Sequence, residues 1–218
     1  MARRTGWIKV AVGLIALGVL GVLFVRSARN VLAEPYEVAR DRLGGWTLAV
    51  DPGSNASGIV VGLRPQPELA SALFSQAFRR SGESLSGPAP AAMPLVLQSE
   101  YDRAMAGALT PEAILAAARA AGLESLAFEP RCMAQRRVSQ PGLTRQVFFL
   151  RFDWPAFDAF RRDVARRLSD AGRHASAFDP AALTPVLIVA ATDAAFSTWL
   201  PLKADPGADD CLAPIAVK

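Results

Sequence analysis

Residues 7–25 read WIKVAVGLIALGVLGVLFV, and this stretch determines how the whole chain is organised. Its only charged residue is Lys9, and from Val10 onward it contains only valine, alanine, glycine, leucine, isoleucine and phenylalanine. A helix of this length, rising about 1.5 Å per residue, comes close to spanning a hydrocarbon core about 30 Å thick. The stretch therefore predicts a transmembrane helix, with the rest of the chain held at a lipid bilayer.

Two other interpretations of residues 7–25 fit less well. A buried core helix carries polar residues at a period of 3.6, and no such stripe occurs from Val10 onward. A secretory signal peptide has a shorter apolar region, followed closely by a small-x-small cleavage site. The only plausible site here, residues 31–33, lies beyond Arg26 and Arg29. We therefore predict an uncleaved signal-anchor, with a cleaved signal peptide as the alternative.

The orientation of the span follows from the basic residues around it. Arg3, Arg4 and Lys9 precede the apolar core with no acidic residue before it, whereas Arg26 and Arg29 follow the core and weaken the asymmetry. Basic residues favour the cytoplasmic side of a membrane, and long soluble domains are translocated largely regardless of local charge. We therefore predict that the N-terminus is cytoplasmic.

This orientation predicts four parts: a cytoplasmic segment at 1–6, the transmembrane helix at 7–25, a juxtamembrane linker at 26–34 and a single extracytoplasmic domain at 35–218. The composition, rich in alanine and arginine and poor in lysine, suggests a GC-rich bacterial genome. The predicted location is therefore a bacterial inner membrane, with the domain in the periplasm. The first predicted partner is the bilayer itself, through residues 7–25.

The charge of the chain does not favour nucleic acid as a partner. Lysine and arginine total 24 against 20 aspartates and glutamates. Three of the basic residues precede the apolar core, which leaves the remainder with 21 basic and 20 acidic residues, a net charge of about +1. A nearly neutral domain has no electrostatic footprint for a phosphate backbone.

Both cysteines, Cys132 and Cys211, lie on the same side of the predicted anchor. An even number of cysteines in an exported domain predicts one disulfide, which requires the two Cα atoms to lie within about 7 Å of each other. The alternative is two separate buried thiols that act as small apolar residues. Two cysteines this far apart form neither a C-x-x-C motif nor a zinc site by themselves.

The hydrophobic pattern along residues 35–218 predicts an α/β domain, more specifically a mixed α+β fold in which about three helices pack on one mixed sheet. The expected order is β-β-α-β-α-β-β-α-β, with strands at 46–50, 59–63, 94–98, from 126, at 144–153 and at 185–190. Helices are expected from 67, from 111 with Thr110 as the N-cap, and from 155. The strand, helix and strand between 94 and 128 predict a parallel crossover. Pro141-Gly142 predicts a hairpin turn.

The strongest helical pattern has an apolar stripe on one face and arginines on the rest. The stripe consists of Trp154, Phe157, Phe160, Val164 and Leu168. The arginines are interleaved with Asp158, Asp163 and Asp170, so a solvated helix face is expected at Arg161, Arg162, Arg166 and Arg167. A contact with anionic lipid or with another envelope protein is the functional alternative for these arginines.

Three residues are candidates for catalysis. His174, the only histidine, lies in a polar segment, and Glu100 and Asp102 follow a predicted strand, where acids are able to serve in acid–base chemistry. The simpler interpretation is a surface histidine and two exposed acids. No serine lies in a nucleophile elbow, and no motif predicts a metal or cofactor site.

Two functional hypotheses follow from this pattern. The first is a non-enzymatic, membrane-anchored component of the bacterial cell envelope that binds a partner protein or helps to assemble a complex. The alternative is a membrane-anchored envelope hydrolase that uses Glu100, Asp102 or His174. The apolar span favours an envelope location in both cases, and the absence of a concentrated catalytic motif in the sequence favours the first.

Overall fold

The structure, a computed structural model, describes residues 14–23, 31–51, 58–125, 129–174, 177–200 and 210–218. The chain divides into two compact units, Met1–Glu34 and Pro35–Lys218. In the first unit, residues 14–23 are helical and exposed. Within the described ranges, no helix is both long enough and apolar enough to cross a membrane. The rest of the predicted span, residues 7–13 and 24–25, lies outside these ranges, so the transmembrane helix stays a prediction.

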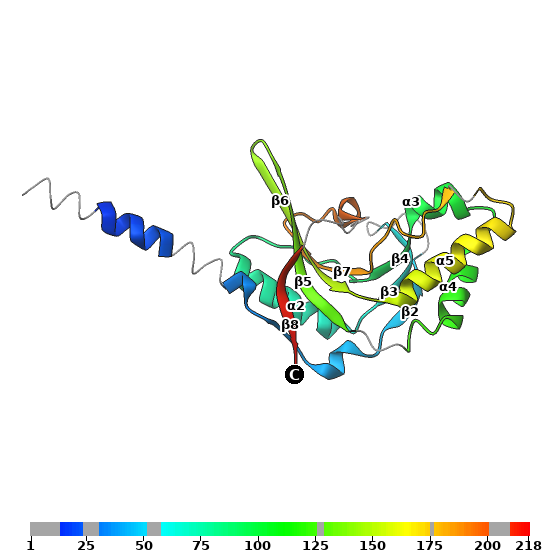
Figure 1. The fold of residues 1–218 in the computed structure, drawn as a ribbon, viewed down its shortest axis with the longest axis horizontal. Coiled ribbons are helices and arrows are strands. Elements are labelled where there is room, and N and C mark those ends of the chain that lie inside the picture. Colours follow the sequence, from blue (N-terminus) through cyan, green and yellow to red (C-terminus); the bar gives the residue numbers. More distant parts are fainter. Residues whose placement is uncertain (1–13, 24–30, 52–57, 126–128, 175–176, 201–209) are drawn as a thin grey trace, which may run out of the picture. The chain divides into compact units, whose positions relative to one another are not determined.

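The domain from Pro35 to Lys218 is built on two β-sheets (Figure 1). The larger sheet has five strands in the order β1 (Tyr36–Val38), β8 (Cys211–Val217), β5 (Pro130–Gln140), β6 (Leu143–Phe152) and β7 (Val186–Ala191). The smaller sheet has three antiparallel strands in the order β2 (Thr47–Val50), β3 (Ile59–Arg64) and β4 (Met93–Leu97). In the larger sheet β1 and β8 are parallel and the other neighbours are antiparallel.

Three long helices accompany these sheets: α2 (Pro67–Ser81), α4 (Pro111–Ala120) and α5 (Pro155–Asp170). Shorter helical segments are η1 (Arg40–Leu43), α3 (Gln98–Glu100), η2 (Tyr101–Met105) and η4 (Phe196–Trp199). Proline occupies the first turn of each long helix, where its missing N–H needs no partner. The Thr110 hydroxyl caps α4 by accepting from the Ala113 N–H at 3.2 Å, as the sequence predicts.

The mixed α+β fold is confirmed, but the prediction of one sheet is wrong. The β4 strand pairs with β3 in the smaller sheet, whereas β5 belongs to the larger one, so no parallel crossover joins them. The physical reason is that α4 packs against β2 and β3 instead of bridging two parallel neighbours. Of the residues expected to begin the strand after α4, 126–128 lie outside the described ranges, and β5 begins at Pro130.

The two strands that the pattern did not predict, β1 and β8, pair with each other. Tyr36 is opposite Ile215 and Val38 is opposite Val217. The three residues of β1 are too few to show an alternation, although Tyr36 and Val38 are both buried. In β8, Pro214 interrupts the pattern of a central strand. Consequently the C-terminal segment is an internal strand of the larger sheet and not a loose tail.

The apolar stripe of α5 is confirmed as part of the core. Trp154, Phe157, Phe160, Val164 and Leu168 are all buried, which turns this face of the helix toward the core and determines which residue lies beside the stripe. The helix α4 contacts α5, and the two are seen together at the right of Figure 1. The helix α2 contacts β1 and β7 instead.

Candidate functional site

Glu100, a candidate catalytic acid, is buried in an ion pair. Its carboxylate accepts two hydrogen bonds from Arg161, one from Nη2 to Oε1 at 2.6 Å and one from Nη1 to Oε2 at 3.2 Å. The backbone N–H of Leu97 donates to Oε2 at 3.0 Å. Glu100 is only 4% exposed, so the expectation of an exposed acid is wrong. Both of its oxygens already have partners, which leaves it less available for proton transfer.

Arg161 is completely buried, so the expectation that it belongs to a solvated helix face is also wrong. Besides Glu100, its guanidinium donates to three backbone carbonyl oxygens, those of Leu95, Asp179 and Pro180, at 3.0, 2.9 and 2.8 Å. It also lies 4.6 Å from the ring centre of Phe178. The position explains the burial, because residue 161 follows Phe157 by four and precedes Val164 by three, next to the apolar stripe.

Asp102 and His174, the other two candidates, are exposed. Asp102 accepts from the side-chain amide of Gln98 at 2.7 Å. Their segments are joined by two hydrogen bonds, from Arg103 to the carbonyl of Ala177 at 3.2 Å and from Arg173 to the carbonyl of Ala106 at 2.6 Å. The structure therefore brings these two segments together, whereas the side chain of Glu100 is committed to Arg161. Catalysis by these residues stays a hypothesis.

In the part of the chain that the structure describes, no group of three or more histidine, cysteine, aspartate or glutamate side chains is arranged to hold a metal ion. The carboxylate of Asp210 accepts from Arg136 Nη2 at 2.7 Å.

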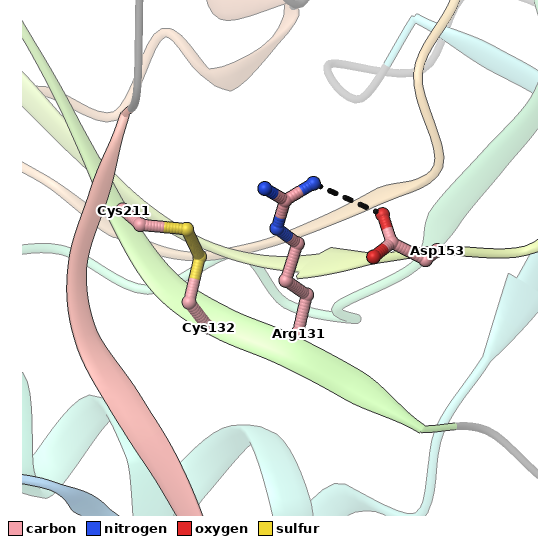
Figure 2. The surroundings of a disulfide bond; sticks show 4 residues. All are labelled: Arg131, Cys132, Asp153 and Cys211. Carbon is pink, nitrogen blue, oxygen red and sulfur yellow. Dashed lines mark hydrogen bonds and ion pairs between the residues drawn. A yellow bond between two sulfur atoms is a disulfide. The ribbon is translucent and has the colours of Figure 1, made fainter.

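The predicted disulfide is confirmed. Cys132 on β5 and Cys211 on β8 are bonded, with their Cα atoms 5.7 Å apart (Figure 2). The bond lies against a buried cluster on one face of the larger sheet, made up of Ala134, Val147, Phe149, Val186, Ile188, Ala191 and Trp199. The neighbouring ion pair in Figure 2, between Arg131 and Asp153 at 3.4 Å, is largely exposed and contributes little stability.

The most distinctive surface feature is the outer part of the β5–β6 hairpin, residues 136–145, which we call the arm. It extends beyond the rest of the larger sheet (Figure 1). Strand β8 accompanies β5 only as far as the pair of Ala134 with Cys211, and β7 accompanies β6 only from the pair of Val147 with Ala191. Among the described strands, residues 136–140 therefore pair with β6 alone. The arm is a two-stranded ribbon whose turn is the predicted Pro141-Gly142.

Alternation along the two strands shows which backbone groups of the arm point outward. The N–H of Gln135 points away from β6, because it donates to the carbonyl of Asp210 at 3.0 Å. The backbone groups of Arg137 and Ser139 point the same way, since the pattern repeats every two residues. On β6, Gln146 exchanges bonds with Thr192, so Thr144 also points outward. Within the described residues, no strand pairs with these outward groups.

The base of the arm is held to the domain by charged side chains. Arg136 pairs with Asp210, and Arg145 donates through Nε to Asp193 and through Nη2 to Thr198 at 2.9 Å. The Arg145 guanidinium also lies 5.1 Å from the ring centre of Trp199. The hydrogen bond from Arg145 lowers the pKa of the Asp193 carboxyl, with burial acting against it and a second hydrogen bond, from Trp199, adding to it. These contacts fix the direction in which the arm projects.

Side chains toward the tip of the arm are exposed. Arg137 donates to the neutral amide oxygen of Gln146 at 3.1 Å, and no carboxylate among the described side chains forms an ion pair with it. Val138, on the opposite face, is 41% exposed. Among its described groups, the arm therefore offers outward backbone groups, the cation of Arg137 and the apolar side chain of Val138. The pattern predicted the hairpin, but the open edges depend on where β7 and β8 end, which no local signal indicates.

No family model, no curated protein and no solved structure matches this chain.

Proposed function

We propose that this protein is a non-enzymatic component of the bacterial cell envelope, anchored to the membrane by residues 7–25 and binding a partner protein through its arm. The observation that carries the proposal is the pair of open edges on the arm. Exposed strand edges are templates for pairing with another chain, and stable monomeric domains usually block them with short strands, proline or covering segments.

Two features support the location in the envelope. The apolar run of residues 7–25 is long enough to approach the thickness of a bilayer. The disulfide between Cys132 and Cys211 supports an oxidising compartment, because such bonds form and persist in the periplasm and outside the cell and are rare in the cytosol.

The partner proposed for the arm is an extended protein segment that carries an acidic residue. Main-chain hydrogen bonds to Arg137 and Ser139 add this segment to the edge of β5 as a new strand. The acidic side chain pairs with Arg137, whose guanidinium has donors left beyond its bond to Gln146. Val138 supplies apolar contact on the other face. Affinity in this arrangement comes from the backbone, and specificity comes from Arg137 and Val138.

The test of this proposal removes one of the outward backbone N–H groups. Ser139→Pro removes the outward donor but leaves the pairing of β5 with β6 intact, because Ser139 does not donate to β6. Ser139→Ala is the matched control, since it removes the hydroxyl and keeps the N–H. The full chain is expressed in a bacterium with a photo-crosslinking amino acid at Thr144 in each background, and adducts are identified by mass spectrometry.

We expect a discrete adduct in the Ser139→Ala background and its loss in the Ser139→Pro background. Equal adducts in the two backgrounds, or none in either, contradict strand addition at the arm. An adduct between two copies of this chain means that the arm mediates self-association and does not bind a different protein.

Fractionation of the same cells tests the anchor: the full-length chain should remain in the membrane fraction after a carbonate wash. A soluble form shortened to begin near residue 34 contradicts it.

A further inference from the structure

Charge is unevenly distributed over a domain that is neutral overall. Residues 35–218 contain 19 basic and 19 acidic residues. Around the start of the domain, however, five basic side chains face two acidic ones, a local net charge of +3. The basic residues are Arg40, Arg42, Arg79, Arg80 and Lys218, and the acidic residues are Glu37 and Asp41. We call this surface the basic surface.

The basic surface surrounds a cleft of about 520 Å³ between β1, η1, α2 and the C-terminal residue. Arg42, Arg79, Arg80 and Lys218 line this cleft together with Glu37. Lys218 forms an ion pair with Glu37 at 2.6 Å, and this hydrogen bond lowers the pKa of the Glu37 carboxyl, with the charge of Arg80 acting in the same direction.

The backbone beneath the basic surface is well held. The amide of Gln76 on α2 binds both backbone groups of Glu37, accepting from its N–H at 2.9 Å and donating to its carbonyl at 2.8 Å. The N–H of Arg40 donates to the carbonyl of Lys218 at 2.8 Å. Arg80 donates to the carbonyl of Pro35 at 3.0 Å and lies 4.2 Å from the ring centre of Tyr36. The cations therefore extend from a backbone that hydrogen bonds already hold in place.

Three of the cations have no acidic partner among the described residues of the domain. Among the described side chains, no carboxylate forms an ion pair with Arg40, Arg42 or Arg79. Among the described contacts, the guanidinium of Arg79 donates to the carbonyl of Ser75 in its own helix. Elsewhere in the described domain several arginines pair with a carboxylate, so this concentration of cations without a described carboxylate partner points to an external anion.

The chain itself indicates which anion is close. The basic surface adjoins Pro35, the first residue of the domain, and nine residues, 26–34, separate Pro35 from the apolar run. Nine extended residues reach at most about 30 Å. If residues 7–25 lie in a bilayer, this short linker keeps the surface around Pro35 close to the lipid headgroups, and a surface on the far side of the domain is held further away.

We propose that the basic surface binds the phosphate of anionic lipid headgroups and so fixes the orientation of the domain on the membrane. The inference rests on the anchoring in the proposed function. Each basic side chain close to an anionic surface strengthens binding about fivefold, so three to five of them supply a useful orienting force. The interaction is electrostatic and weakens as salt is added.

The experiment uses the full chain in phosphatidylcholine nanodiscs. These contain a small fraction of either phosphatidylglycerol or phosphatidylcholine that carries a photoactivatable headgroup. Mass spectrometry locates the cross-linked peptides. The test variant is Arg42→Gln with Arg79→Gln. The control is Arg162→Gln with Arg166→Gln, which removes two exposed charges from α5 and leaves the basic surface unchanged.

We expect phosphatidylglycerol to cross-link to α2 and η1 in the wild type and the control, with a yield well above that of phosphatidylcholine. The test variant should lower this preference about 25-fold, at about fivefold per charge. Equal yields from the two lipids, or equal loss in both variants, overturn the proposal. Abolition of the cross-link by inorganic phosphate, but not by chloride at equal ionic strength, also overturns it, since the site then takes a free anion.

The anchor is assessed separately in the same samples. If the chain does not enter the nanodiscs, the anchoring in the proposed function fails, and the lipid inference is judged from vesicles with the same photoactivatable lipids added to the full chain. Cross-linking at α2 that depends on Arg42 and Arg79 then supports the inference without an anchor, and its absence overturns it.

Discussion

Two regions of this domain join distant segments through arginine and carboxylate, and they do so in different physical settings. In the α5 region, the side chains of Arg161 and Glu100 are 0% and 6% exposed. At the base of the arm, the side chains of Arg145 and Asp193 are 30% and 27% exposed. The first pair lies in the protein interior, whereas the second remains in contact with water.

The comparison shows that a buried arginine requires a complete set of hydrogen-bond partners. Arg161 makes five hydrogen bonds, two to Glu100 and three to carbonyl oxygens, so no charge is left uncompensated in the interior. The base of the arm is held by partly exposed ion pairs, and the strands beside it, β5 and β8, are joined covalently by the bond between Cys132 and Cys211. Each region should therefore fail when a different kind of interaction is removed.

The largest effect is expected from Cys211→Ser. The two cysteines are 79 residues apart, and closing a loop of this length stabilises by about 4–5 kcal/mol in the chain-entropy model. Because β8 lies between β1 and β5, the loss should also loosen β1. Urea unfolding measures the first effect, and hydrogen exchange at residues 36–38 and 211–217 measures the second.

The control for this prediction is the wild type in a reducing agent, which should reproduce the variant. A free energy of unfolding within about 1 kcal/mol of the wild type would show that the disulfide adds little to the packing of β8. Unchanged exchange in β1 would show that its pairing with β8 survives without the bond.

The second effect is expected from Glu100→Ala, which leaves Arg161 buried without its carboxylate. Removing one member of a buried ion pair costs about 3–5 kcal/mol. Arg161→Met should also destabilise, although hydrophobic replacements of buried charges are often tolerated, because it leaves the carbonyls of Leu95, Asp179 and Pro180 without a donor. Thermal and urea unfolding measure both variants.

The matched control lies on the same helix. Asp163 binds Arg166 and Arg167 on the exposed face of α5, and surface substitutions of this type usually change stability by no more than about 0.5 kcal/mol. Asp163→Asn should therefore be nearly silent. A cost for Glu100→Ala as small as that for Asp163→Asn would mean that water reaches Arg161 and that the pair is not in the interior.

The same contrast separates the features that the sequence predicts from those that it does not. The pattern predicted the apolar stripe of α5, the cap at Thr110, the Pro141-Gly142 turn and the disulfide, because each depends on local spacing or on compartment. It treated Arg161 like its neighbours Arg166 and Arg167. The spacing of Arg161 from Phe157 and Val164 places it beside the stripe, but the burial of its charge depends on Glu100, 61 residues away, which no local pattern indicates.

The same reason explains the errors in the sheet and in the site. A strand as short as β1 is recognised only through its partner β8, which lies at the other end of the chain. Within the described residues, the arm has open edges because β7 and β8 stop before the hairpin does. The basic surface likewise combines residues from β1, η1, α2 and the C-terminal end. Features of this kind depend on long-range register, which periodicity does not encode.

The smallest effect of the three is expected at the base of the arm, and it should depend on pH. Arg145 holds the pKa of the Asp193 carboxyl below its usual range, so the ionised form is favoured in the folded state. A group whose pKa is lowered by folding stabilises the protein above its unfolded pKa, and this contribution is lost as the pH falls through the folded pKa. Asp193→Asn should therefore destabilise the protein at neutral pH, less than Cys211→Ser or Glu100→Ala does. The difference from the wild type should shrink in acid.

Unfolding curves from neutral to acidic pH measure this effect. They are repeated in an Arg145→Gln background, which removes the hydrogen bond that lowers the pKa. If Asp193→Asn shows the same dependence on pH in that background, the pair with Arg145 is not what lowers the pKa, and the contacts from Trp199 and the backbone of Ala195 must hold the carboxylate instead.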